Sequence, residues 1–418
     1  MRVVLVAGKG GVGKTTLAAA VAAAFAATGR KTLVVSTDRA HSLGDALGIS
    51  LGAAPSEVDA GLSASQVDTR ALVAGAWDGL RAHLGTLLAG AGVDELVAEE
   101  LTVLPGLEEL VALSEVDRMA RSGLWDVVVV DCAPTAESLR LLALPEAAAT
   151  YLERLFPTHR RLVRGMLAGL AGAGASASRW DAAADAIGRL VERLDSLRAL
   201  VADQRTTSLR LVLTPERVVA AETRRAVTTL TLQGIRVDGL VANRLVPALD
   251  PADAGPAASW LRTRRAEQDA VLAGLRADLP DLPLCTVTHR AHEPVGPASL
   301  LELAGELAGS GPDPLLDPGG GAAQRPLLSV ERGAGAGVDA EYLLRLAVPL
   351  IDAGEVALAR VGDELAVTAA GHRRLVPLPS VLRRCVLSSA ATDADGLVVR
   401  FRPDPALWLR TGEQTGSE

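Results

Sequence analysis

Aromatic residues and cysteines are scarce in this chain of 418 residues. Aromatic residues make up 2% of the chain, so alanine, leucine and valine must fill most of the core. The three cysteines, Cys132, Cys285 and Cys385, are far apart and have no paired spacing. This distribution excludes a disulfide framework and a sequence-local zinc clip, and it fits a reducing compartment. We therefore expect a cytoplasmic protein.

Long uncharged segments and an excess of positive charge are also missing. The longest runs without a charged residue, 15–29 and 165–178, are shorter than the roughly 20 residues that a membrane-spanning helix needs. We expect no signal peptide either, because Met1 and Arg2 run directly into an apolar segment. The net charge of −8 and the isoelectric point of about 5.4 argue against a general nucleic-acid binder. The sequence thus predicts a soluble chain that binds no nucleic acid and does not insert directly into a membrane.

A glycine-rich stretch near the N-terminus carries the clearest motif. Gly8, Gly13, Lys14 and Thr15 fit the pattern G-x-x-x-x-G-K-S/T, between an apolar run and an alanine-rich segment that favours a helix. Glycines at these positions let successive backbone N–H groups surround phosphate oxygens at a helix N-terminus. The motif therefore predicts a nucleoside triphosphate site, with ATP and Mg²⁺ as cofactors. The residues predicted to bind the nucleotide here are Gly8, Lys9, Gly10, Gly11, Val12, Gly13, Lys14, Thr15 and Thr16.

Within this loop, Lys14 is expected to reach the outer phosphates and the Thr15 hydroxyl to bind Mg²⁺. Two alternatives share these residues. The spacing G-x-G-x-x-G also fits a dinucleotide-binding loop, with Asp38 at about the distance of its ribose-binding acid. Lys14 and Thr15 argue against that loop, since a pyrophosphate without a γ-phosphate or a metal ion needs neither group. An ordinary glycine turn is disfavoured because the motif is complete and follows a strand.

Two aspartates end predicted strands near the loop. Asp38 ends the segment 31–38, and Asp131 ends the apolar run 125–131. An acid at the carboxyl edge of a sheet, beside the phosphate loop, can orient a water for attack on the γ-phosphate, and this is the role predicted for Asp38. A helix N-cap is the alternative role for that residue. Asp131 is predicted to hold Mg²⁺ through water, so the predicted metal residues are Thr15, Asp38 and Asp131.

Three of these segments resemble one branch of the ATPases with a deviant Walker A loop. Lys9 beside the first glycine, the segment 36–45 (STDRAHSLGD) and the segment 131–145 (DCAPTAESLRLLALP) look like the loop, switch I and switch II of the arsenite-pump and tail-anchored-protein targeting ATPases. The resemblance implies ATP hydrolysis by a homodimer in which Lys9 crosses to the partner's nucleotide. Lys9, Lys14 and Asp38 are then the catalytic residues, with the two lysines stabilising charge on the transferred phosphoryl group.

The chain departs from the switch motifs of this branch at four positions. Arg39 replaces the usual proline of switch I, and Cys132, Ala136 and Glu137 replace the usual threonine, glycine and histidine of switch II. Loss of the proline and of the glycine is expected to change the stiffness of the two switches and the extent of their movement, rather than the chemistry.

A further resemblance concerns the base of the nucleotide. The predicted strand 237–242 is followed by Asn243, Arg244 and, at 247, a proline, which resembles the adenine-reading turn of the same branch. The resemblance implies that the Asn243 amide pairs with the base edge and that Arg244 belongs to the same turn. A structural Asx-turn is the alternative for Asn243.

The length of the chain and the order of its segments predict two domains. Residues 1–308 are expected to form a doubly wound, mostly parallel α/β P-loop NTPase domain, with helical insertions at about 58–122 and 146–205. Residues 309–338 have the composition of a flexible Gly/Pro-rich linker. The short strands expected in 339–405 resemble the small all-β α-crystallin-like sandwich that some members of the branch carry, and residues 406–418 form a tail.

The sequence leaves two purposes open for the predicted ATPase cycle. In the resembling targeting ATPases the two helical insertions form an apolar groove, which implies a carrier or chaperone of hydrophobic, tail-anchored-like helical clients; a plain helical hairpin is the alternative. The second purpose is that of the soluble energising subunit of a metalloid efflux pump. Arsenite requires convergent thiolates, and the three cysteines lie in separate predicted elements. The predicted partners are a second copy of the chain and a hydrophobic client, a membrane receptor or a pump.

Overall fold

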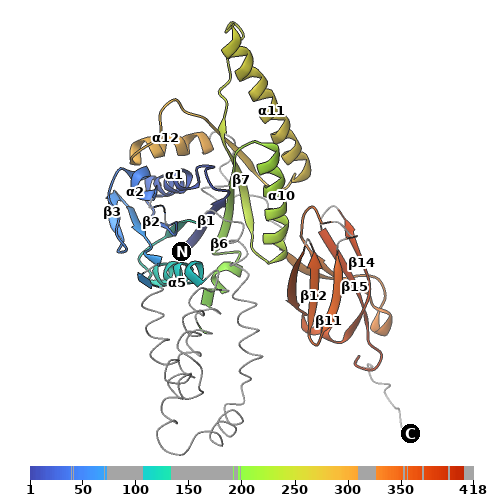
Figure 1. Ribbon diagram of the computed structural model, residues 1–418. Coiled ribbons are helices and arrows are strands. Elements are labelled where there is room, and N and C mark those ends of the chain that lie inside the picture. The colour runs from blue at the N-terminus through green and yellow to red at the C-terminus, as the bar shows by residue number, and fades with distance from the viewer. Residues whose placement is uncertain are drawn as a thin grey trace, which may run out of the picture.

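A computed structural model of the chain shows a large α/β domain and a small β domain (Figure 1). The structure describes residues 1–72 apart from 39, 41 and 70, residues 107–132, 192, 196–197 and 199–308, and residues 326–408 apart from 352, 353, 355, 370, 394 and 395. The predicted helical insertions lie mostly outside the described residues. So do Arg39, Ala136 and Glu137, the first half of the predicted linker and the tail from residue 409 on.

An eight-stranded sheet in the order β3-β4-β2-β5-β1-β6-β7-β8 forms the centre of the large domain. All neighbouring strands pair in parallel except β3, which pairs antiparallel with β4 at the edge. The inner strands are almost wholly buried because helices cover both faces of the sheet. The strands are β1 (Arg2–Gly8), β2 (Thr32–Ser36), β3 (Ser56–Asp59), β4 (Leu62–Gln66), β5 (Val127–Asp131), β6 (Thr207–Leu213), β7 (Val237–Leu245) and β8 (Leu284–Thr288). The predicted doubly wound α/β class is confirmed.

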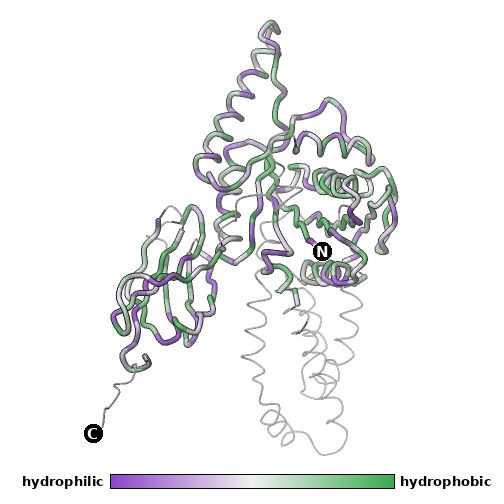
Figure 2. Tube along the Cα trace, turned by 180° about the vertical axis from the view of Figure 1, so that it is seen from behind, coloured by the Kyte–Doolittle hydropathy of each residue, from purple (hydrophilic) through white to green (hydrophobic). Residues whose placement is uncertain are grey.

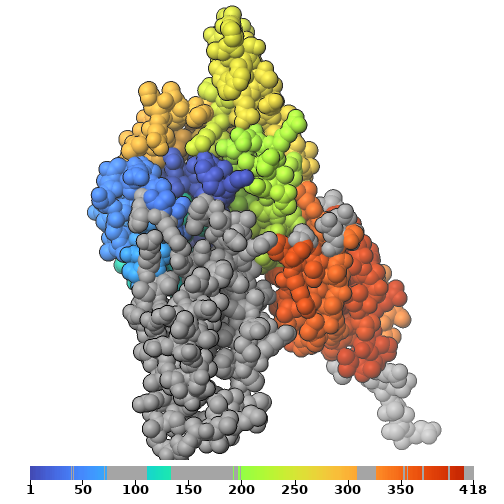
Figure 3. Space-filling view, viewed as in Figure 1, coloured from blue at the N-terminus to red at the C-terminus, as the bar shows by residue number. Residues whose placement is uncertain are grey.

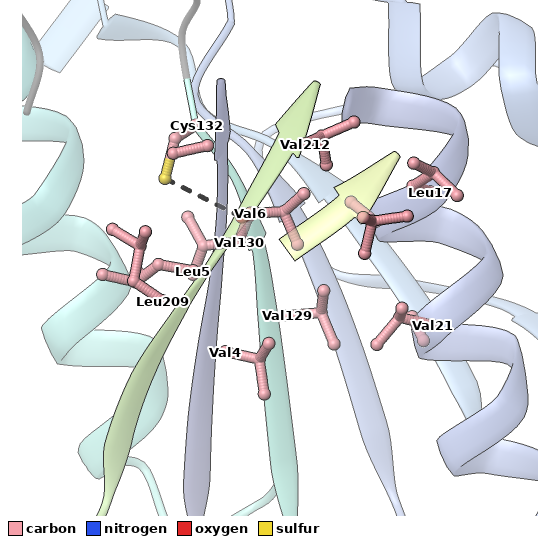
Figure 4. Close-up of a cluster of buried hydrophobic side chains, with 14 of the residues drawn as sticks. Val4, Leu5, Val6, Leu17, Val21, Val129, Val130, Cys132, Leu209 and Val212 are labelled. Atoms are coloured by element: carbon pink, nitrogen blue, oxygen red, sulfur yellow. Dashed lines mark hydrogen bonds between the residues drawn. The ribbon is translucent and has the colours of Figure 1, made fainter. Parts of the chain in front are cut away.

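The helices α1 (Lys14–Ala27) and α5 (Leu107–Arg121) flank the sheet on opposite faces (Figure 4). Leu17 and Val21 of α1 pack against the strands, where Val4, Leu5 and Val129 are buried. Eight alanines, with their small side chains, let α1 lie close to the sheet and to the neighbouring helix, α12 (Pro297–Ala308). The remaining helices of this domain are α2 (Ser42–Leu47), α10 (Arg217–Leu232) and α11 (Pro256–Asp278).

Helix α11 projects from the domain at the top of Figure 1 and alternates between hydrophilic and hydrophobic colours along its length in Figure 2. Four of its residues are buried, and three of these lie in its second half: Gln268, Leu272 and Leu275. Trp260, in the first half, is 66% exposed. The helix is therefore anchored by its C-terminal half, and that half positions the buried Gln268 next to the end of β7.

The small domain packs a four-stranded sheet, β14-β15-β10-β9, against a three-stranded sheet, β11-β12-β13, as the predicted sandwich requires. Leu344, Val367, Val376, Val399 and Phe401 are fully buried between them. A two-residue hairpin turn at 362–363 joins β11 to β12. The strands are β9 (Leu328–Arg332), β10 (Tyr342–Leu346), β11 (Ala357–Val361), β12 (Glu364–Ala369), β13 (His372–Pro377), β14 (Cys385–Asp393) and β15 (Gly396–Pro403), with a short helix α13 (Ser380–Arg383).

The sandwich is attached to the C-terminal end of α10 (Figure 3). Leu232, the last residue of α10, is 1% exposed and belongs to the apolar core of the sandwich rather than to that of the α/β domain. The Arg374 guanidinium donates to the Leu232 carbonyl at 2.6 Å, and the Thr228 hydroxyl donates to the Pro349 carbonyl at 3.0 Å. One helix of the α/β domain is therefore shared between two cores.

Two predicted boundaries differ from the structure. The helical insertion expected from about residue 58 is wrong at its start, because β3 and β4 occupy this region and form an antiparallel edge. The linker expected over 309–338 contains β9, whose Leu328 and Val330 pack on the sandwich core. In the short strands β4 and β9 apolar residues alternate with polar ones, a pattern that is hard to detect within Gly-rich and polar surroundings.

Candidate nucleotide-binding site

The predicted phosphate loop connects β1 to the N-terminus of α1. Gly8 lies so close to β6 that a Cβ atom there would be 2.2 Å from the Val212 carbonyl oxygen. Gly13 has a φ of +92°, and a Cβ atom there would lie 2.4 Å from the Asn243 amide nitrogen. Only glycine fits at either position. Because α1 begins directly after Gly13, the backbone N–H groups of the loop lie at the N-terminus of this helix.

Lys14 is buried inside this loop. Its side chain is 5% exposed, and its ammonium donates to the Lys9 carbonyl at 3.3 Å. Burial lowers the pKa of Lys14, while the nearby carboxylates of Asp131 and Asp38 oppose that shift. A buried cation with backbone donors around it is a site for a polyanion such as a triphosphate.

Asp131 ends β5 directly beside this lysine and is fully buried. The Ser36 hydroxyl donates to its Oδ2 atom at 3.0 Å, whereas Oδ1 has no hydrogen-bond partner among the described residues. Burial raises the pKa of Asp131 to about 6, against the opposing effects of Thr15, Ser36 and Lys14. An unpaired buried carboxylate oxygen beside a hydroxyl fits a hard divalent cation such as Mg²⁺.

Asp38 lies two residues beyond the end of β2. Its N–H donates to the Ser36 hydroxyl at 3.2 Å, and its Oδ1 atom accepts a bond of 3.0 Å from the N–H of Ala40. Since helix α2 begins at Ser42, the bond to Ala40 forms a turn before the helix and does not cap its first turn. The structure thus brings Asp38, Asp131 and Lys14 together, with the Ser36 hydroxyl between the two aspartates.

Lys9 differs from Lys14 in its surroundings. Its side chain is 47% exposed and forms an ion pair of 3.0 Å with Glu222 of α10. The exposed ammonium of Lys9 can therefore leave its partner at little cost, because ion pairs at the surface contribute little to stability. No motif in the sequence identifies Glu222 as the partner of Lys9.

Asn243 contacts the phosphate loop. Its amide nitrogen donates to the Val12 carbonyl at 2.8 Å, and its Oδ1 atom accepts from the N–H of Arg244 at 2.9 Å. Arg244 is exposed and has a φ of +60°, and β7 extends through both residues with irregular pairing. Gln268, 3% exposed, fixes the next residues by accepting from the N–H of Val246 at 2.8 Å and donating to the Arg244 carbonyl. The role of Asn243 at the adenine base stays a prediction.

Sequence reasoning missed a second buried glutamine, at the end of β4. Gln66 is 3% exposed, and its amide nitrogen donates to the Asp38 carbonyl at 2.7 Å and to the Ser36 carbonyl at 3.4 Å. Its contacts depend on the pairing of β4 with β2, which aligns Gln66 with Ser36. No local pattern in the sequence reports such a pairing.

The three thiols do not form a common site. Cys132 is buried among apolar side chains of the core (Figure 4), and burial raises its pKa to about 12. Cys285 is buried in β8, and Cys385 is buried in the sandwich. In the part of the chain that the structure describes, no group of three or more His, Cys, Asp or Glu residues could hold a metal ion, and no helix combines the length and the apolar character needed to cross a membrane.

Comparisons with known proteins agree with this geometry. Residues 1–309 match the family model described as anion-transporting ATPase, and residues 339–401 match the model of an HSP20-like domain found in ArsA. Protein Rv2184c of Mycobacterium tuberculosis is 40% identical, over 97% of each chain. A protein of Chlorobaculum tepidum, provisionally named an arsenical pump-driving ATPase, is 30% identical over 91% of this chain and 90% of its own. The ATPase GET3 of Podospora anserina is 30% identical over 59% of this chain and 74% of its own.

Proposed function

This chain belongs to the anion-transporting ATPase family and is an ATPase, and we propose that it hydrolyses ATP with bound Mg²⁺ as a homodimer that cycles between open and closed forms. In this cycle it carries or chaperones hydrophobic helical clients. The observation that carries the catalytic part of the proposal is that the Ser36 hydroxyl joins Asp38 and Asp131 at the carboxyl edge of the sheet, with Lys14 near both carboxylates.

The residues that fit Mg²⁺ are Thr15, Asp38 and Asp131, since Asp131 offers a buried oxygen without a hydrogen-bond partner. Bound Mg²⁺ supplies positive charge to the phosphate oxygens. The loop N–H groups and Lys14 bind the outer phosphates, and the buried surroundings strengthen their attraction for negative charge. The Asp38 carboxylate accepts a hydrogen bond from the attacking water and so orients it toward the γ-phosphorus.

The homodimer is supported by the contrast between the two lysines of the loop. Lys14 is buried within its own loop, whereas Lys9 lies at the surface and pairs with the exposed Glu222. An exposed cation adjacent to a phosphate loop can reach a nucleotide on a second copy of the chain, where it adds charge stabilisation that a single copy lacks.

The carrier role rests on the resemblance of the switch segments and on the placement of the two predicted helical insertions. The ends of these insertions meet at Asp117 of α5, whose Oδ2 atom accepts a bond of 2.8 Å from the Ser196 hydroxyl. Residues near the ends of the two predicted insertions are thus in contact, which is compatible with two parts of one client site. The alternative role in a metalloid pump has less support, because the buried and separate thiols offer no convergent sulfur ligands.

The catalytic proposal is tested by phosphate release from Mg·ATP. The Lys14→Ala variant is expected to lose hydrolysis, while Lys31→Ala, which removes an exposed lysine directly before β2, keeps the wild-type rate. Retained hydrolysis in Lys14→Ala would overturn the assignment of the site.

The carrier proposal needs a separate measurement. Capture of a labelled transmembrane-helix peptide is measured for the purified chain with ATP, with ADP and without nucleotide. Capture that depends on the nucleotide, and that loses this dependence in Lys14→Ala, supports a client carrier. Absence of capture in all three states overturns the carrier role and leaves the ATPase assignment intact.

A further inference from the structure

We propose that Gln66 is a positioning residue for hydrolysis: its side-chain amide holds the main chain of Asp38 and thereby fixes the carboxylate that orients the attacking water. This inference rests on the proposed role of Asp38. Gln66 lies in β4, outside every motif of the sequence, and it touches neither the phosphate loop nor Asp131 through a hydrogen bond among the described residues.

The position of Gln66 follows from strand pairing. Gln66 is the last residue of β4 and is aligned with Ser36, the last residue of β2. Its own N–H donates to the Gly52 carbonyl at 2.9 Å, and the next N–H, of Val67, donates to the Ser36 carbonyl at 2.9 Å. Beyond Ser36 the chain no longer pairs with β4, although the Thr37 N–H still donates to the Asp131 carbonyl of β5 at 3.0 Å. On the β4 side, the Gln66 side chain provides the next contact.

The Gln66 amide provides that support at the carbonyl side of Asp38. Its nitrogen lies 2.7 Å from the Asp38 carbonyl oxygen, while the Ser36 hydroxyl accepts the N–H of Asp38 at 3.2 Å. Both main-chain polar groups of Asp38 are therefore bound by buried side chains. The carboxylate projects from a backbone that is fixed on both sides, and its charge opposes the lowering of the Lys14 pKa by burial.

The burial of Gln66 indicates a function in positioning. Its side chain is 3% exposed, and its Oε1 atom is buried with no hydrogen-bond partner among the described residues. A buried polar oxygen without a partner costs stability, and an apolar side chain of equal length would avoid that cost. The amide nitrogen is therefore the side-chain atom of Gln66 that forms hydrogen bonds, and the shorter of these is to the Asp38 carbonyl.

Hydrogen bonds of Ser36 also link the contact between Gln66 and Asp38 to Asp131, the residue proposed to hold Mg²⁺. The Ser36 carbonyl accepts from Gln66, and its hydroxyl donates to Asp131 Oδ2. Gln66, Ser36, Asp38 and Asp131 thus form one buried hydrogen-bond network, which holds the water-orienting and metal-holding carboxylates in a fixed relation. Lys14 and the loop glycines are outside it, so loss of Gln66 should affect turnover more than nucleotide binding.

The test uses Gln66→Met, which keeps the length of the side chain and removes the amide. We expect kcat to fall about tenfold or more, since small displacements of catalytic groups have large effects, with the Kd for Mg·ATP changed less than twofold. Gln66→Asn keeps the amide but is too short to reach Asp38, and we expect the same loss. The matched control is Gln233→Met, which alters another glutamine with a buried oxygen, beyond the end of α10, and should keep the wild-type kcat.

A double-mutant cycle separates positioning from general structure. Single-turnover rates are measured for Gln66→Met, Asp38→Asn and the double variant. If Gln66 acts through Asp38, Gln66→Met lowers the rate in the wild-type background and causes no further loss in the Asp38→Asn background. Equal losses in both backgrounds, or wild-type kcat in both Gln66→Met and Gln66→Asn, would overturn the inference alone. Wild-type hydrolysis in Asp38→Asn would instead overturn the proposed role of Asp38, and the inference with it.

Discussion

Ser36 donates a hydrogen bond of 3.0 Å to Asp131 Oδ2, although both residues are fully buried and lie 95 positions apart in the chain. The bond joins the ends of β2 and β5, which are paired in register at these residues. It satisfies one oxygen of the carboxylate and leaves the other for a ligand. A buried carboxylate of this kind affects both stability and activity, and the two effects can be separated by substitution.

Asp131→Asn is expected to stabilise the nucleotide-free protein at pH 8 and to abolish hydrolysis. The pKa of Asp131 is raised to about 6 in the folded chain from an ordinary value of 3.8, so the unfolded chain ionises first. Stability therefore falls as pH rises from about 4 to 6, by roughly 3 kcal/mol at 1.4 kcal/mol per pKa unit, and stays lower above pH 6. The neutral asparagine avoids this loss. Denaturant unfolding at pH 5 and pH 8 measures the effect, and a variant less stable than wild type at pH 8 would contradict it.

Mixing two inactive variants tests whether Lys9 acts across the dimer. Lys9→Ala and Asp38→Ala are each expected to lack hydrolysis. In a mixed dimer, the Lys9→Ala subunit keeps its Asp38 and receives Lys9 from its partner, so one of two sites is complete. Random pairing should restore about a quarter of the wild-type rate. If Lys9 acts on its own nucleotide, the mixture stays inactive.

Arsenite is expected to leave the ATPase rate unchanged within twofold. The Cys132 thiol is buried with a pKa raised to about 12, and Cys285 and Cys385 are buried in other elements. Thiols that are neutral and inaccessible bind a soft metalloid poorly. Steady-state hydrolysis over an arsenite titration is the measurement, with alkylation of the three thiols in the native and the denatured chain as the control for access. Stimulation that disappears in Cys132→Ser would refute this expectation.

Leu232→Ala is expected to release the sandwich from α10 while hydrolysis continues. Truncation of a buried leucine in a core costs about 2–5 kcal/mol, and Leu232 is the residue of α10 that enters the sandwich core. Small-angle scattering should show a larger radius of gyration for the variant. Val218→Ala changes a 66% exposed residue of the same helix and should leave the radius unchanged. An unchanged radius in Leu232→Ala would show that the sandwich is held by other contacts.

The sequence predicted the elements whose signals are local. Buried parallel strands are continuous apolar runs, so the predicted segments 31–38 and 125–131 lie close to the observed bounds of β2 and β5. Asp38 and Asp131 were placed at one edge of the sheet because the carboxyl ends of parallel strands share that edge. The glycine motif predicted the loop, since Gly8 and Gly13 have no room for a side chain.

Contacts between distant segments could not be predicted in this way. Gln66 reaches Asp38 through the alignment of β4 with β2, Asn243 binds a carbonyl 231 positions away, and Glu222 faces Lys9 from α10. Each depends on which strands and helices are neighbours, which a single sequence does not contain. The short strands β3 and β9 were missed for a related reason: a segment of four or five residues becomes a strand only when an existing sheet offers it an edge.

The place of Leu232 has a consequence for how this gene can change over generations. A stop codon after the α/β domain would remove the sandwich in one step and leave an uncovered leucine and an unpaired end of α10 at the surface. The shortened product would aggregate more readily until a second substitution made position 232 polar. Descendants that have lost the sandwich should therefore carry a polar residue there, and those that keep it should carry a large apolar one.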